Sequence, residues 1–146
     1  MSTDREIVRQ LDREFGSLIN SLKGLASSVP ATLLYRNPPA ISIGENILRS
    51  AAAIEQTCGG ITSNLWDDPF EWTLPETLST PESIVAHLSE VDLLRRRVFE
   101  SIDGDDALSK YVAVPSGEPK PLIELLIETL ARACHYRGRA DATLRK

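Results

Sequence analysis

The sequence predicts an all-α fold, a four-helix bundle in which residues 1–146 form one domain. Three observations predict this fold. Four segments repeat apolar residues at helical spacing, and the one β-like segment, 111–114, is too short to build a sheet. In addition, about twenty residues separate the second and third helices, from Ile61 to Ser79, and a connector of that length suits a crossover along a bundle.

Local start signals place the first two helices. Thr3 with Glu6 and Ser42 with Glu45 each form a capping box, in which the two side chains bind backbone N–H groups that the helix leaves free. The apolar stripes that follow cover residues 7–25 and 43–58. We expect Gly59-Gly60 to end the second helix, because glycine favours the position just after a helix.

The third and fourth helices have similar signals. Thr80 is the expected cap of the third helix, and Pro81 fits its first position because proline lacks the N–H that would be unpaired there. The fourth helix is expected over residues 121–139 and has the most persistent apolar stripe. Trp66 and Trp72 lie in the crossover, and we expect them to hold it against the helices.

Composition restricts the classes of partner. The 146 residues carry a formal net charge of -5, without the basic face that nucleic-acid binding requires, and an anionic membrane would repel them. No apolar run approaches the roughly 20 residues that cross a bilayer, and the charged N-terminal segment does not resemble a signal peptide. We therefore expect a cytoplasmic protein that binds neither nucleic acid nor a membrane.

Three features of the chain resemble the DinB/YfiT-like superfamily of bacterial four-helix bundles. They are Ser42-Ile43-Gly44-Glu45 at the start of the second helix, the long aromatic connector, and His135-Tyr136-Arg137-Gly138-Arg139 near the C terminus. The resemblance covers nearly the whole chain in layout. It implies an up-down-down-up bundle with a divalent metal held by three histidines, one on the second helix and two on the last. Thiol transfer, isomerisation and metal-dependent hydrolysis are the activities it implies.

The chain departs from that pattern at the implied metal ligands. The three positions hold Arg49 (or Ser50, with a shift of one residue), Arg132 and Tyr136, and none of them is histidine. Arginine stays protonated and repels a cation. We therefore expect the usual metal site to be lost and predict no cofactor.

The two histidines are placed differently on their helices. On a helical wheel, His135 falls nearly opposite the apolar stripe, which predicts a solvent-exposed side chain. His87 falls on the flank of the third helix, where a partly buried, hydrogen-bonded histidine is the commoner case and a cavity ligand is the alternative.

Four charged residues fall on apolar stripes, namely Glu55, Asp92, Arg95 and Arg137. An unpaired charge in a core costs several kcal/mol, so these groups are expected to pair or to face a wet cavity. One interpretation is a buried network, for example Glu55 with Arg137 and Asp92 with Arg95. The other is a polar pocket, with His87 at its edge, that binds a small anionic molecule through arginine. The two interpretations are compatible.

The two cysteines give no sign of catalysis. Cys58 and Cys134 both fall near apolar stripes, and no histidine is placed by sequence to activate either thiol. We expect small core residues rather than nucleophiles, and the sequence identifies no catalytic residue.

Three functional hypotheses follow. The first is a small-molecule-binding or stress-associated bundle without the family's metal site. The alternative is a metal-dependent hydrolase or thiol S-transferase that uses non-standard ligands, such as His87 with Glu55 or Asp92. The third is an interaction protein that pairs as a homodimer through a helix face.

Overall fold

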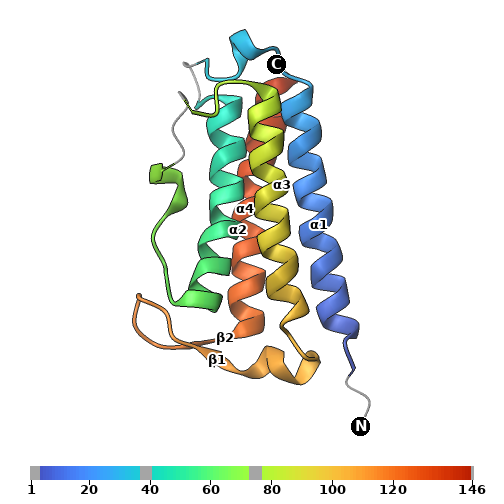
Figure 1. Cartoon of the computed structure of the whole chain (residues 1–146), viewed down its shortest axis with the longest axis vertical. Helices are drawn as coiled ribbons and strands as arrows, with labels where there is room; N and C mark the ends of the chain where they lie inside the picture. Colours follow the sequence, from blue (N-terminus) through green and yellow to red (C-terminus); the bar gives the residue numbers. More distant parts are fainter. Residues whose placement is uncertain (1–3, 37–40, 73–76, 146) are drawn as a thin grey trace.

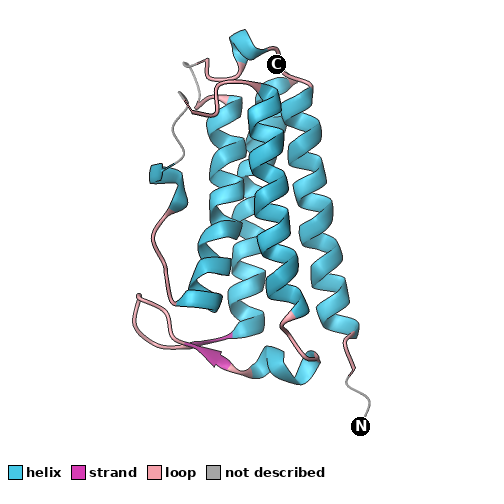
Figure 2. Ribbon diagram, viewed as in Figure 1, coloured by secondary structure: helices cyan, strands magenta, loops and turns pink. Residues whose placement is uncertain are grey.

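Four long helices run side by side and make up most of the structure (Figures 1 and 2). They are α1 (Glu6–Ser27), α2 (Ile43–Ser63), α3 (Pro81–Glu100) and α4 (Leu122–Leu144). The computed structural model describes three stretches of the chain, residues 4–36, 41–72 and 77–145. The predicted all-α four-helix bundle is confirmed.

The helices follow the expected up-down-down-up order (Figure 1). α1 and α4 run in one direction, whereas α2 and α3 both run in the other. Since α2 and α3 are parallel, the chain must return along the bundle between them. The 3-10 turn η2 (Pro69–Trp72) is part of this return and packs against α2. A second 3-10 turn, η1 (Ala31–Leu33), follows α1.

The β-like segment forms only a short ladder at the end of the bundle opposite the C terminus. After the turn η3 (Asp105–Ser109), β1 (Tyr111–Val112) pairs antiparallel with β2 (Lys120–Pro121). Tyr111 lies opposite Pro121 and Val112 opposite Lys120. No larger sheet occurs in the described residues, as the shortness of this segment predicts.

The core lies between the helices, and α2 is its most buried member. Its three consecutive alanines, residues 51–53, are all buried, and α2 packs more extensively against α4 than any other two elements pack together. Three buried hydroxyl groups support this contact: Ser50 Oγ donates to the carbonyl of Ala133 at 2.7 Å, and the hydroxyls of Thr57 and Thr129 lie 2.6 Å apart. Small residues and paired hydroxyls therefore let α2 and α4 approach closely.

The local cap predicted for α1 is replaced by a cap from a distant segment. Thr3 lies outside the described residues, and the helix begins at Glu6, so Glu6 is not the third helical residue that a capping box needs. Instead, the carboxylate of Asp105 in η3 accepts hydrogen bonds from the backbone N–H groups of Ile7 (3.1 Å) and Val8 (3.0 Å). The start of α1 is therefore tied to η3, the turn that follows α3.

The caps predicted for α2 and α3 are found where expected. Ser42 Oγ accepts a hydrogen bond from the N–H of Glu45 at 3.1 Å. Thr80 caps α3 in a reciprocal pair with Ser83, and Pro81 is the first helical residue. Helix α4 extends past its expected end at residue 139, since its next residue is fully buried in the core.

Gly59-Gly60 does not end α2 as the sequence suggested. The helix continues to Ser63, and Asn64 ends it in the left-handed conformation with φ of 55°. The glycine is required for packing, because a Cβ on Gly60 would overlap the ring of Trp66. Gln56 also donates to the carbonyl of Trp66 at 2.8 Å, so the start of the crossover is held against α2. The side chain of Trp72 lies outside the described part of the chain.

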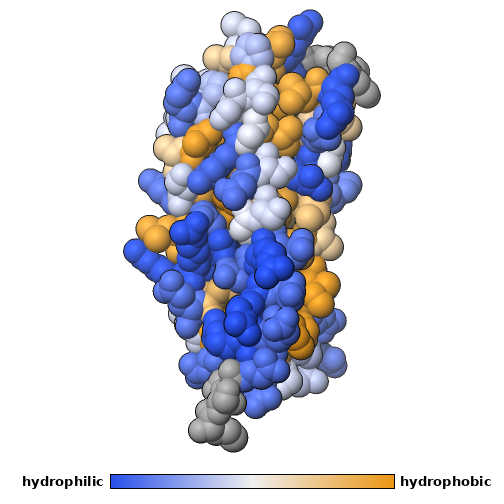
Figure 3. Space-filling view, turned by 90° about the vertical axis from the view of Figure 1, so that its right-hand side faces the viewer, coloured by the Kyte–Doolittle hydropathy of each residue, from blue (hydrophilic) through white to orange (hydrophobic). Residues whose placement is uncertain are grey.

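The face of the bundle that carries α1 is mostly polar (Figure 3). On the face that carries α1, hydrophilic side chains predominate and hydrophobic ones lie in smaller groups between them (Figure 3). Within the described residues, no helix has the length and apolar character needed to cross a membrane.

Candidate functional site

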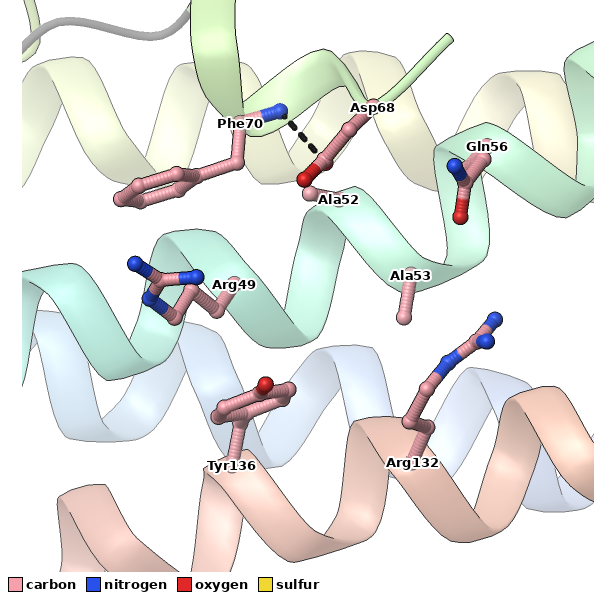
Figure 4. A pocket seen from close by; sticks show the side chains of 8 residues that line it. All are labelled: Arg49, Ala52, Ala53, Gln56, Asp68, Phe70, Arg132 and Tyr136. Carbon is pink, nitrogen blue, oxygen red and sulfur yellow. Dashed lines mark hydrogen bonds between the residues drawn. The ribbon is translucent and has the colours of Figure 1, made fainter. Parts of the chain in front are cut away.

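A small pocket opens between α2, α4 and the crossover (Figure 4). Its volume is about 110 Å³. We call it the arginine pocket; its lining residues are Arg49, Ala52, Ala53, Gln56, Asp68, Phe70, Arg132 and Tyr136. A larger depression of about 550 Å³ lies between the end of α1 and the start of α3, but Glu82 is the one charged side chain in its lining.

The pocket is formed by small side chains of α2, larger polar side chains of α4 and an aromatic ring from η2. α2 contributes small residues at 52 and 53, which leave space in front of α4. Arg132 and Tyr136 are one turn apart on α4 and therefore lie on the same face of that helix. Phe70 comes from η2, on the other side of α2 from α4 in this view (Figure 4).

Arg49 is held between two aromatic side chains (Figure 4). Its guanidinium carbon lies 4.0 Å from the centre of the Phe70 ring, a cation–π contact, and Tyr136 lies on its other side. Its Nε is buried and has no hydrogen-bond partner in the described part of the chain. No carboxylate of the described residues forms an ion pair with Arg49 or with the exposed Arg132.

Two other polar residues of the pocket are used to shape the crossover. Asp68 Oδ1 accepts a hydrogen bond from the backbone N–H of Phe70 at 3.0 Å, and Gln56 donates to the backbone of Trp66. The lining therefore contains two arginines and one carboxylate, and the carboxylate already accepts a hydrogen bond. This balance favours an anion as the occupant.

The three positions that the resemblance assigned to metal ligands meet in this pocket. Arg49 on α2 lies across from Arg132 and Tyr136 on α4. Two permanent positive charges oppose a cation at this place and attract an anion. The sequence pointed to these residues only as lost ligands, and their convergence on one pocket comes from the structure.

The predicted pair of Asp92 and Arg95 is confirmed, away from the arginine pocket. Arg95 is 3% exposed, and its Nη2 donates to Asp92 Oδ1 at 2.6 Å. Its other terminal nitrogen donates to Asp12 of α1, and Arg96, an exposed residue, lies 3.0 Å from Asp92. Sequence reasoning missed Asp12, since it lies beside the apolar stripe of α1 and nothing local shows which side chain of α3 it faces. Gly16 leaves room for the Arg95 side chain, because a Cβ on this glycine would lie only 3.3 Å from the Arg95 guanidinium.

Glu55 lies beside His87, whereas the pairing of Glu55 with Arg137 is not found among the described residues. His87 Nε2 is 3.8 Å from Glu55 Oε1, and this oxygen is buried without a hydrogen-bond partner there. Burial raises the pKa of the Glu55 carboxyl, His87 lowers that pKa, and Glu90 raises it further. The helical wheel placed Glu55 on the apolar stripe and His87 on the flank of the third helix, but it could not show that the two side chains are neighbours.

The predictions for His135 and Arg137, both on α4, have different outcomes. His135 is exposed, as expected, and its ring makes an edge contact with that of Tyr136 at 5.3 Å between centroids. Arg137 is half-buried, and its Nε is buried with no hydrogen-bond partner in the described residues. Arg137 does not line the arginine pocket, so the five residues predicted as one polar cluster are distributed over separate places.

The cysteines are free thiols inside or near the core. Cys58 is buried and Cys134 is half-buried. Burial raises the pKa of the Cys58 thiol to about 12, with a lowering effect of Arg95 and a raising effect of Glu55. A thiol that stays protonated is a poor nucleophile, so the structure gives Cys58 the packing role that its position on the stripe predicts.

Comparisons with known proteins give no family: no family model matches the chain, and no curated protein or solved structure matches it either. Among the described residues, no group of three or more His, Cys, Asp or Glu side chains is in place to hold a metal ion.

Proposed function

We propose that this protein binds a small anionic molecule in the arginine pocket. The observation that carries the proposal is that Arg49 and Arg132 line one small cavity and form no ion pair with a carboxylate of the described residues. Arginine recognises carboxylate and phosphate groups through paired N–H donors, and Tyr136 offers a further hydroxyl.

The size of the pocket limits the ligand. Its volume of about 110 Å³ compares with about 30 Å³ for one water in the liquid, so it holds the equivalent of a few waters. A carboxylate or phosphate group with a short attached chain fits this space, whereas a larger ligand would have to extend into solvent. The ring of Phe70 holds the Arg49 guanidinium in place, which reduces the loss of side-chain entropy on binding.

Kinship with the DinB/YfiT-like bundles is part of the same proposal. The up-down-down-up order and the convergence of Arg49, Arg132 and Tyr136 at the implied ligand positions support it. In this proposal the chain keeps the family's layout and has arginines where the family holds a metal. A role in a stress response and a homodimer remain predictions.

The proposal is tested by titrating the purified full chain with inorganic phosphate and with acetate, oxalate and pyruvate, using calorimetry at low ionic strength. We expect at least one of these anions to bind, and Arg49→Met or Arg132→Met to weaken binding at least about ten-fold, as expected for loss of a charged hydrogen bond. Arg49→Lys keeps the charge but loses the planar donor fork, so it should weaken a bidentate contact.

The matched control is Arg139→Met, on an exposed arginine of α4 that does not line the pocket. This variant should bind the same anion as tightly as the unmodified chain. Equal affinity of the Arg49→Met, Arg132→Met and Arg139→Met variants would contradict the proposal. So would the absence of binding for all four anions.

A further inference from the structure

The arginine pocket carries charges of both signs. Asp68, from the crossover, lines the same cavity as Arg49 and Arg132. Its carboxylate forms no ion pair with a basic side chain of the described residues. The N–H of Phe70 occupies one acceptor position of Oδ1, and a carboxylate offers about four such positions. Opposite charges therefore line one small cavity without pairing with each other, and the carboxylate keeps acceptor positions for a ligand.

A second acceptor of the pocket comes from α2. The amide nitrogen of Gln56 donates to the carbonyl of Trp66, so the amide oxygen is the atom left to accept from a ligand. Figure 4 shows Asp68 and Gln56 on the crossover side of the pocket, whereas Arg132 lies on the opposite side, on α4. The acceptors and the α4 arginine are therefore separated across the cavity.

We propose that the carboxylate bound in the arginine pocket belongs to an amino acid, whose ammonium group binds Asp68. The proposal rests on anion binding by the arginine pocket and adds the class of ligand. An α-amino acid carries a negative and a positive group on one carbon, which matches a lining with both signs of charge. A plain carboxylate would satisfy the arginines but would bring a negative charge close to Asp68, which repels it.

The size of the pocket fits the part that all α-amino acids share. This part consists of a carboxylate, one carbon and an ammonium nitrogen, and the volume of about 110 Å³ holds the equivalent of a few waters of about 30 Å³ each. The small side chains of Ala52 and Ala53 offer apolar surface to the central carbon. The side chain of the ligand extends into solvent, so the pocket recognises the amino acid head group rather than one particular side chain.

The crossover positions both kinds of charge. The hydrogen bond from the N–H of Phe70 to Asp68 Oδ1 joins residues two apart, a turn that aspartate side chains commonly form, and it holds the carboxylate in place. The ring of the same Phe70 lies 4.0 Å from the guanidinium carbon of Arg49. One short segment therefore orients the acceptor for the ammonium group and one of the two arginines for the carboxylate.

Pairs of ligands that differ in the ammonium group test the proposal: glycine against acetate, and aspartate against succinate. Each is titrated into the full chain by calorimetry at about pH 7 and low ionic strength. We expect each amino acid to bind at least about ten-fold more tightly than its counterpart without nitrogen, as expected for one charged hydrogen bond.

The Asp68→Asn variant should remove this preference. Asparagine keeps an oxygen for the N–H of Phe70, so the turn is preserved, but it lacks the negative charge that attracts ammonium. Because the repulsion of a plain carboxylate is also removed, acetate should bind to Asp68→Asn at least as tightly as to the unmodified chain. The matched control is Asp67→Asn, at an exposed neighbour outside the lining, which should keep the preference.

Equal affinity for the two members of each ligand pair would overturn the proposal, as would an undiminished preference in a folded Asp68→Asn variant. Circular dichroism checks the fold, and the ligand pairs test the unmodified chain even if the variant is not folded. In either case, acetate binding that Arg49→Met weakens would still support the proposed function. Absence of binding for the amino acids overturns the amino acid proposal alone when acetate binds, and both proposals when no anion binds.

Discussion

Arg95 and Arg49 show how one residue type can have opposite roles on two sides of the same bundle. Between α1 and α3, Arg95 is buried and its guanidinium binds the carboxylates of Asp12 and Asp92. Beside α4, Arg49 is half-buried and lies over the ring of Phe70, and it forms no ion pair with a carboxylate of the described residues. A charge that is neutralised inside the fold stabilises it, whereas a charge without a partner remains available to a ligand.

The largest expected effect comes from breaking the Arg95 network. Asp92→Ala leaves Arg95 buried with one fewer carboxylate, and we expect it to lower the free energy of unfolding by about 3 kcal/mol, measured by urea denaturation. The control is Arg96→Ala, which removes a 63% exposed partner of the same carboxylate and should cost less than about 1 kcal/mol. An equal loss of unfolding free energy in the two variants would show that the buried Arg95 guanidinium does not need the Asp92 carboxylate.

The next effect concerns the distant cap of α1. Asp105→Ala removes the acceptor of two backbone N–H groups at the start of the helix and should cost about 1–2 kcal/mol, as other helix caps do. Asp106→Ala, at the exposed neighbouring position, should change stability by less than about 0.5 kcal/mol. Thermal or urea unfolding followed by circular dichroism measures both. A cost for Asp106→Ala as large as that for Asp105→Ala would contradict the cap.

On the other side of the bundle, Arg49→Met should have a smaller effect on stability. The variant keeps the apolar stem and loses a cation–π contact worth about 0.5–1 kcal/mol. We therefore expect unfolding in urea to show a loss of no more than about 1 kcal/mol, although the same variant should bind the proposed anion at least about ten-fold more weakly. A loss near that of Asp92→Ala would mean that Arg49 is structural, and the contrast between the two arginines would disappear.

The smallest effect concerns pH and Glu55. Burial raises the pKa of this carboxyl in the folded chain, so its ionisation favours the unfolded state once the pH rises above the ordinary carboxyl pKa of 4.5. Relative to the unmodified chain, Glu55→Gln should therefore be more stable at about pH 7 than at about pH 4. Urea denaturation at both values measures this difference, and the exposed Glu124→Gln is the control. If the stability of Glu55→Gln relative to the unmodified chain is the same at both pH values, the raised pKa of Glu55 is contradicted.

The sequence predicted the inward direction of charged residues better than it predicted their partners. The wheels placed Asp92 and Arg95 inside, and their spacing of three residues on one helix let the pair be foreseen. Glu55 was also placed inside, but its neighbour is His87 rather than Arg137. Partners on different helices depend on how two helices are rotated and shifted against each other, and no local pattern records that.

Taken alone, the sequence determined the number of helices, the caps of α2 and α3 and the existence of a crossover, because apolar period, capping residues and loop length act over a few neighbouring residues. Tertiary structure alone decided the cap of α1 by Asp105, the continuation of α2 through Gly60 under Trp66, and the meeting of Arg49 with Arg132 and Tyr136. Each of these joins segments distant in sequence, so each depends on packing that the chain acquires only when all four helices are together.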